Sequence, residues 1–224
     1  MKPLKITAWL DAPLAGEIPM LDSIVEWSMS LHLDSICPGV KRAGPDEPVE
    51  PGTIPIPIRR RRVGRFPVPL CSAGITHAPI IDTHEHFHMS MAGIRATETC
   101  DRRVLSVKSG QHRSYRLPLR VRVVDRVCWY VVGRAKDLRR WLRGVPAVGK
   151  KTAYGYGLVA RWEVEPAGED WSWFAPSPAG PVLMRPLPAE VDLPDGLIGY
   201  RRWFGSPVPP YWQRNLYTEI VQPC

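Results

Sequence analysis

A glycine-rich stretch just past the middle of the chain, GKKTAYGYG, carries side chains that could hold a phosphorylated ligand. Glycines let backbone N–H groups approach a phosphate closely, lysines supply positive charge, and tyrosine rings can stack on unpaired bases. A plain connection with one glycine at a helix end would not explain the whole combination. The stretch therefore predicts an RNA-binding loop that consists of Gly149, Lys150, Lys151, Tyr154, Gly155, Tyr156 and Gly157.

Two common nucleotide-binding motifs do not fit this stretch. The P-loop requires GxxxxGK, followed by Ser or Thr, after a buried strand and before a helix. Here two of the three glycines, Gly155 and Gly157, follow the lysines, a predicted helix precedes the stretch, and a predicted strand follows it. The GxGxxG dinucleotide motif fails for the same reason of context. We interpret the stretch as a helix-to-strand connection beside a basic helix.

Basic residues are concentrated around this stretch. The chain has a formal net charge of +8. Residues 102–151 contain fifteen lysines and arginines and two acidic residues, so the rest of the chain is slightly acidic. This segregation of charge indicates a face that binds a polyanion. The candidates on a predicted strand and a predicted helix are Arg116, Arg120, Arg122, Arg139, Arg140 and Arg143.

A second basic run lies in a proline-bounded segment earlier in the chain. It could form a solvated face, but an extended segment with this charge is better placed to contact phosphates. We therefore expect a nucleic-acid clamp that consists of Arg59, Arg60, Arg61, Arg62 and Arg65.

Three histidines alternate in the stretch IIDTHEHFH, as His84, His86 and His88. On a strand this spacing places imidazoles on one face, and it resembles the first metal ligands of amidohydrolases. Those enzymes are β/α barrels of about 250 residues, whereas one histidine, His112, follows in this chain of 224 residues. A structural or RNA-facing cluster is favoured, with a metallohydrolase as the third alternative. We expect no metal and no other cofactor.

The spacing of apolar residues predicts the elements that must position these side chains. Apolar residues alternate at 4–10 and 158–164, as in half-buried strands, and recur at three and four residues over 20–31 and 138–145, as in amphipathic helices. Two further strands, at 116–124 and 128–132, are expected to pair across a tight connection. The order strand, helix, strand pair, helix, strand is that of the α+β, ferredoxin-like split βαβ fold.

Composition divides the chain into two parts. We expect a ferredoxin-like RNA-binding domain at 1–165 with a long irregular insertion at about 37–100, because that stretch is rich in proline and glycine. Residues 166–224, rich in proline and tryptophan, are expected to pack on the body or on a partner subunit. The five scattered cysteines form no CxxC motif, and no apolar run reaches membrane-spanning length, so a cytoplasmic protein is expected.

Two blocks of the sequence resemble a known family. Residues 4–27 (LKITAWLDAPLAGEIPMLDSIVEW) and residues 131–162, a helix that runs into a Gly-Lys-rich loop ending in GYG and then a strand, are similar to the Cas-five-type subunit of type IV CRISPR systems. This Csf-three family is a branch of the RAMP superfamily of RNA-binding proteins. The resemblance implies an RRM-like, ferredoxin-like fold and a non-catalytic subunit that grips the 5′ handle of the crRNA and caps the backbone filament. The implied partners are crRNA and the backbone and large-subunit-like proteins, and contact with target DNA near the PAM stays open.

The same superfamily includes enzymes, and this leaves an alternative. Some crRNA-processing members use a histidine near the end of the first helix as general base for attack by a ribose 2′-OH. His32 occupies that region here. A histidine at a helix C-terminus is also favoured simply by the helix dipole, so we expect no catalysis and keep a metal-independent endoribonuclease as the runner-up.

Overall fold

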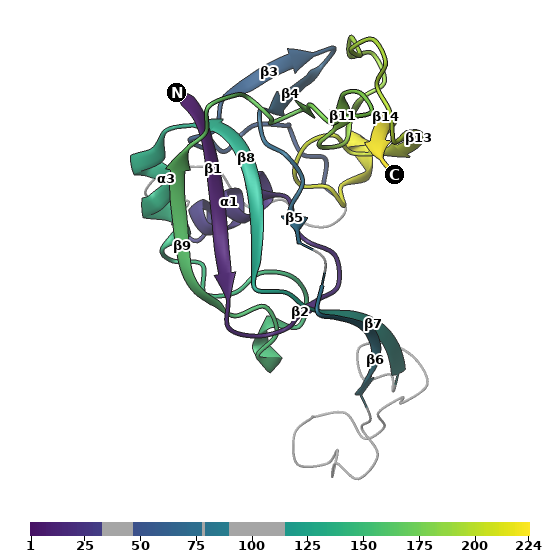
Figure 1. The fold of residues 1–224 in the computed structure, drawn as a ribbon. Helices are drawn as coiled ribbons and strands as arrows, with labels where there is room; N and C mark the ends of the chain where they lie inside the picture. The colour runs from purple at the N-terminus through teal and green to yellow at the C-terminus, as the bar shows by residue number, and fades with distance from the viewer. Residues whose placement is uncertain (33–46, 78, 90–114) are drawn as a thin grey trace.

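The computed structural model describes residues 1–32, 47–77, 79–89 and 115–224. The described chain forms a main sheet covered by helices, a two-stranded ribbon that projects from its lower end, and a C-terminal β-rich part (Figure 1). It is therefore a mixed α+β fold with mostly antiparallel strands, as expected.

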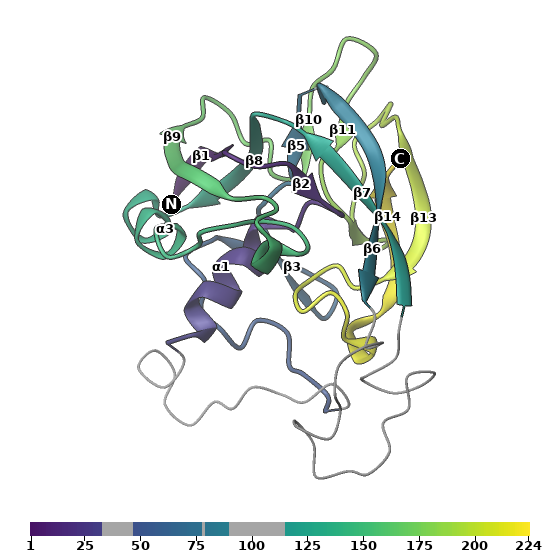
Figure 2. The ribbon, with the colours of Figure 1, turned by 90° about the horizontal axis from the view of Figure 1, so that it is seen from below.

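The main sheet contains four antiparallel strands in the order β5–β8–β1–β9 within the described residues. They are β5 (Ile75–Thr76), β8 (Arg126–Gly133), β1 (Lys2–Leu10) and β9 (Val159–Pro166). The central strand β1 pairs with β8 on one side and with β9 on the other. Helices α1 (Leu21–Ser30) and α3 (Ala135–Leu142) cover the same face of this sheet (Figure 2).

The first core lies between this sheet and the helices, and its residues follow the predicted periodicities. Leu4, Ile6 and Ala8 alternate along β1 and are buried. Leu138 and Leu142, one turn apart on α3, are fully buried as well. Burial of each such aliphatic side chain contributes about 1.5–3 kcal/mol. Both predicted helices are present. Of the apolar residues that recur over 20–31, however, Ile24 is buried, whereas Trp27 and Leu31 are 50% and 51% exposed, so the predicted stripe of the first helix is confirmed only in part.

The expected pairing of residues 116–124 with 128–132 is wrong. Strand β7 (Tyr115–Val123) pairs instead with β6 (Ile81–Met89), and the short β2 (Leu14–Ala15) adds to its other edge. The edge of β8 is taken by β5. An alternating pattern determines which side chains share a face, but it does not identify the partner strand. For this reason the sequence pattern was compatible with either pairing.

The region expected to be an irregular insertion lies partly outside the described residues. Its described part contains regular strands: β5, the nine-residue β6, and a hairpin of β3 (Arg60–Val63) and β4 (Phe66–Pro69). The two strands of this hairpin have four residues each, and strands with this much proline are usually short or lie at an edge.

The C-terminal part has more strand than its composition suggested. It contains β10 (Phe174–Ala175), β11 (Val182–Leu183), β12 (Leu187–Pro188), β13 (Tyr200–Gly205), the 3-10 turn η3 (Arg214–Leu216) and β14 (Thr218–Pro223). Apolar side chains of this part pack against the β3–β4 hairpin in a second core, which includes Val63, Phe66, Val68, Trp173, Leu187 and Val221. The extension therefore packs on the body of the protein.

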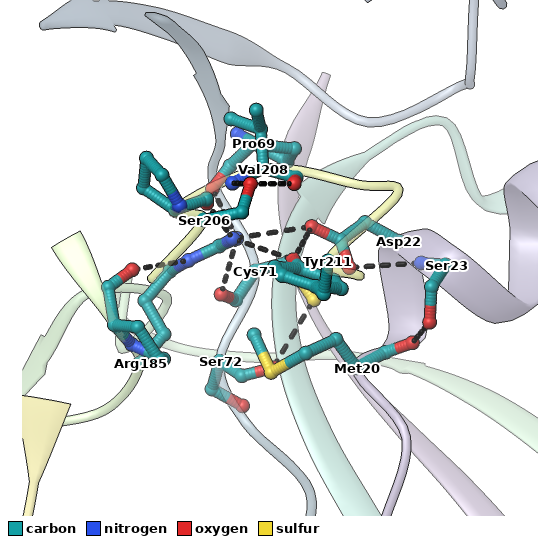
Figure 3. A network of polar contacts seen from close by, with 12 residues as sticks. Met20, Asp22, Ser23, Pro69, Cys71, Ser72, Arg185, Ser206, Val208 and Tyr211 are labelled. Carbon is teal, nitrogen blue, oxygen red and sulfur yellow. Dashed lines mark hydrogen bonds and ion pairs between the residues drawn. The ribbon is translucent and has the colours of Figure 1, made fainter. Parts of the chain in front are cut away.

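A buried polar network also joins the C-terminal part to the body (Figure 3). The Arg185 side chain is fully buried and lies 3.2 Å from the carboxylate of Asp22 at the start of α1. The Tyr211 hydroxyl accepts from Arg185 at 2.9 Å and donates to Asp22 at 2.7 Å. Arg185 further donates to backbone carbonyls at 2.8–3.1 Å, those of Pro69, Cys71 and Pro207.

The protonation states in this network follow from burial and charge. Burial alone would lower the pKa of Arg185, but the carboxylate of Asp22 raises it, so the guanidinium stays charged. Burial raises the pKa of Tyr211, so its hydroxyl keeps the proton that it donates. The network is an ion pair whose donors and acceptors are matched inside the protein.

Candidate nucleic-acid interface

The glycine-rich loop, residues 149–157, connects α3 to β9 and includes the 3-10 turn η2 (Thr152–Tyr154). Its backbone lies against the segment around β2. The N–H of Lys150 donates to the carbonyl of Ala15, and the N–H of Gly157 donates to the carbonyl of Pro13, both at 2.8 Å. Two of the predicted phosphate-binding amides are thus used within the protein.

The glycines of this loop have positive φ angles, and two of them have backbone neighbours that leave no room for a side chain. Gly149 has φ 91°, and a Cβ there would lie 2.8 Å from the carbonyl oxygen of Ala15. Gly157 has φ 63°, and a Cβ there would clash with the carbonyl of Val148. At Gly155, φ 89°, a Cβ would meet no described atom within 4 Å. Of the three glycines, Gly155 is the one with open space where a side chain would lie, but its N–H donates to the carbonyl of Thr152 at 3.0 Å.

Three side chains of the loop dock it onto the β6–β7 ribbon, which comprises Ile81–Met89 and Tyr115–Val123. The ammonium of Lys151 lies 3.6 Å from the ring centroid of Phe87. The Tyr154 ring meets Phe87 edge-on, with centroids 4.7 Å apart. The Tyr156 hydroxyl donates to Glu85 at 2.5 Å, which raises the pKa of Tyr156. Loop and ribbon therefore form one unit.

The two tyrosines differ in exposure. Tyr156 packs against Ala15, Leu119 and Val121 in a small cluster, whereas Tyr154 is 66% exposed. Both tyrosines were predicted to belong to the RNA-binding loop, but one of them packs inward. In this arrangement Tyr154 is the one whose ring surface is available to a base.

The opposite face of the ribbon is lined with basic side chains and imidazoles. The register pairs His84 with Arg120 and His88 with Arg116, and Asp82 with Arg122. Side chains that face each other across antiparallel strands share a face, so the predicted arginines of β7 and the three histidines of β6 are brought together. His86 lies between the other two histidines on this face.

Polar contacts fix two of these arginines. Arg120 binds Asp82 with two hydrogen bonds of 2.9 and 2.6 Å, and this contact lowers the pKa of Asp82. Arg122 donates to the carbonyl of Gly16 at 2.8 Å. Among the described residues, no group of three or more His, Cys, Asp or Glu side chains is arranged to hold a metal ion.

The three predicted arginines of α3 lie on its exposed side. Arg139 donates to the carbonyl of Val164 at 2.7 Å, and Arg140 stacks over Trp141 at 5.1 Å. Arg143 follows the last helical residue and is exposed. Residues 143–148 connect α3 to the glycine-rich loop, so these charges lie on the element that precedes the loop.

The second basic run is divided between the interior and the surface. Arg60 donates to the carbonyls of Gly52 and Ile54 at 2.8 and 2.6 Å, and burial lowers its pKa. The others are exposed on the β3–β4 hairpin, where Arg61 lies 5.7 Å from the ring of Trp173. Arg60 holds the preceding loop and is not available to a clamp. The exposed arginines of the run are Arg59, Arg61, Arg62 and Arg65.

The candidate base His32 lies just after α1, with its ring 5.8 Å from that of Trp141. The structure places it at the helical layer, while His84, His86 and His88 belong to the projecting ribbon. Sequence reasoning missed Glu85 and Phe87, the residues that receive the loop. The sequence shows that these two residues alternate with the histidines, but it does not show that the glycine-rich loop contacts them.

The comparison with known families gives one match. The model of the CRISPR type IV associated protein Csf3 matches residues 82–223, well over half of the chain. None of the curated proteins compared matches the chain. In the described residues, no helix combines the length and apolar character needed to cross a membrane.

The matched range includes the β6–β7 ribbon, α3, the glycine-rich loop and the C-terminal part. Of the two blocks that carried the resemblance in the sequence, the match includes residues 131–162 but not residues 4–27. It also extends through the tail to residue 223. The resemblance itself is confirmed: the chain belongs to the Csf3 family of type IV CRISPR-associated proteins.

Proposed function

We propose that this protein is a non-catalytic, crRNA-binding subunit of a type IV CRISPR ribonucleoprotein, which grips the 5′ handle of the crRNA and caps the backbone filament. The observation that supports this most strongly is the docking of the glycine-rich loop onto the β6–β7 ribbon through Lys151, Tyr154 and Tyr156. It places an exposed ring and a lysine pair on one face of the ribbon, while the arginines of the ribbon line its other face. Backbone phosphates and unpaired bases need those two kinds of group together.

The strand order supports a ferredoxin-like assignment for the main sheet. In that fold the split βαβ units give an antiparallel sheet in which the first strand lies between the third and the fourth. Here β1 lies between β8 and β9, helices α1 and α3 cover one face, and β5 takes the place of the second strand. We therefore propose the RRM-like topology, with β5 as a two-residue edge strand and the β6–β7 ribbon as an addition.

The expected RNA path follows the exposed charges. Lys150 is an exposed residue of the loop, and Arg143 is exposed at the C-terminal end of α3. Arg116 lies near the far end of the ribbon. Phosphate contacts from such side chains position a strand without reading its sequence, and a base stacked on Tyr154 would add sequence-tolerant affinity.

Ultraviolet crosslinking of the protein to its cognate repeat RNA, followed by mass spectrometry of the peptides, tests this proposal. We expect crosslinked peptides from residues 115–124 and 149–158. Arg116→Ala should weaken binding, whereas Lys2→Ala, an exposed basic residue at the start of β1, should leave it unchanged. Crosslinks confined to residues 166–224, or equal binding by both variants, would contradict the proposal.

A further inference from the structure

Strand β13 (Tyr200–Gly205) lies at the edge of the sheet β12–β14–β13 within the described part of the chain. Its sequence is YRRWFG, and its side chains are unusually exposed for their types. Tyr200 is 39% exposed, Trp203 59% and Phe204 64%. Large aromatic side chains gathered on one strand at this level of exposure indicate an interaction surface.

The exposure affects both faces of the strand. Tyr200, Arg202 and Phe204 alternate on one face, and Arg201 and Trp203 alternate on the other. The neighbouring strand β14 is different, because its Ile220 and Val221 are buried. The described chain therefore covers β14 and leaves β13 open on both faces and along one edge. Natural proteins cover or blunt such edges, since unpaired N–H and C=O groups invite another strand.

The local charge argues against nucleic acid as the ligand of this strand. Residues 166–224 contain four arginines, no lysine and six acidic residues. One of the arginines, Arg185, is buried, and Arg202 is paired with Glu219 at 2.7 Å. A polyanion would meet a mildly acidic region here, in contrast to the basic loop and ribbon.

The composition of the strand fits a protein partner. Trp, Tyr, Phe and Arg are enriched at the centres of protein–protein interfaces, where they carry most of the binding energy. The guanidinium of Arg201 lies 5.4 Å from the ring of Trp203, so a charge and an apolar surface are presented together. A complementary partner segment would carry apolar side chains and at least one carboxylate.

We propose that the free edge of β13 binds an extended segment of another protein subunit of the type IV complex, which adds as a further strand. Its apolar side chains pack on Trp203 and Phe204, and an acidic side chain pairs with Arg201. Strand addition supplies affinity through main-chain hydrogen bonds, and side-chain contacts supply specificity. This surface is distinct from the loop and ribbon proposed for crRNA, so it does not depend on that function.

Co-expression of the full-length protein with the other protein subunits of its own type IV complex tests this surface. Trp203→Ser combined with Phe204→Ser should weaken assembly at least tenfold in a titration of the purified subunits. The matched control is Trp27→Ser on α1, where a tryptophan is 50% exposed. In hydrogen–deuterium exchange of the wild type, the amides of Tyr200–Gly205 should become protected on assembly.

Separate measurements keep the outcomes distinguishable. Repeat RNA binding of the isolated double variant should equal that of the wild type. Arg201→Glu is a milder change that should also weaken assembly, and it serves as the test if the double variant fails to fold. Normal assembly of both variants with unprotected β13 amides would overturn the proposal. Protection by repeat RNA alone, or by self-association seen in sedimentation, would overturn it as well.

Discussion

The arginines of the β6–β7 ribbon and of α3 lie at the surface, whereas Arg185, which joins the C-terminal part to the body, is completely buried. Several of these arginines have one polar partner each, such as Asp82 for Arg120 and the carbonyl of Gly16 for Arg122. Arg185 instead has an ion pair with Asp22 and several backbone acceptors. The same side chain is therefore proposed to bind a ligand in one region and to stabilise the fold in the other, and the difference lies in burial rather than in residue type.

Breaking the buried pair should have the largest effect. Replacement of Arg185 by Leu leaves the buried carboxylate of Asp22 without its countercharge, and loss of one partner of such a pair costs about 3–5 kcal/mol of folding free energy. Arg202→Leu, which breaks an exposed ion pair with Glu219, should leave the unfolding midpoint nearly unchanged. Urea unfolding of the two variants checks this contrast, and equal midpoints would show that the buried network is not a source of stability.

A second prediction concerns the exposed ring of the loop. If a base stacks on Tyr154, Tyr154→Leu should lower the affinity for repeat RNA by roughly 1–3 kcal/mol with little change in stability. Tyr156→Phe removes the hydrogen bond to Glu85 but keeps the ring, so it serves as the matched control. Filter binding and thermal melting of both variants separate the two roles. A Tyr154→Leu protein that binds normally but melts early would assign this tyrosine to packing.

A third prediction uses pH. Burial, and then the charge of Asp22, raise the pKa of Glu26 to about 7, against the lowering effect of Arg60. Between about pH 4.5 and 7 the folded state thus keeps a proton that the unfolded chain releases, so stability falls as pH rises through this window. Because Glu26 is partly solvated, we expect about 1–2 kcal/mol.

Glu26→Gln tests the origin of this pH dependence. The variant should match the wild type near pH 4.5 and be more stable at pH 8, because it has no carboxylate to ionise. Urea unfolding at both pH values gives the comparison. A parallel loss of stability in variant and wild type would show that another group causes the pH dependence.

The regular elements of the main sheet could be predicted from the sequence. Alternation along β1 and β9 and the apolar periodicity of α1 and α3 are local patterns, and each was enough to find its element, although not every apolar residue of α1 is buried. The partner of β7 could not be found in this way, because the same alternation suits any neighbouring strand. The two-residue β5 is too short to leave a periodic signal.

The candidate site was predicted in part. The composition of the glycine-rich loop identified its residues, but not that Lys151 and Tyr156 would be engaged by Phe87 and Glu85 from a segment more than sixty residues away. The burial of Arg185 could not be predicted from the sequence, because an isolated arginine among prolines is expected at the surface. The contacts of these side chains depend on residues far away in the sequence, and a local sequence pattern does not identify those residues.

The separation of a binding surface from a stabilising network is tested most directly by a salt series. Repeat RNA labelled at its 5′ end is titrated with wild type, Lys150→Ala and Lys2→Ala at neutral pH in EDTA, and its integrity is followed on a gel with and without divalent metal. Wild type should bind and leave the RNA intact, and Lys150→Ala should reduce the log–log salt slope by about one, whereas Lys2→Ala should not. An unchanged slope for Lys150→Ala, or one discrete RNA product that His32→Ala abolishes, would contradict the account.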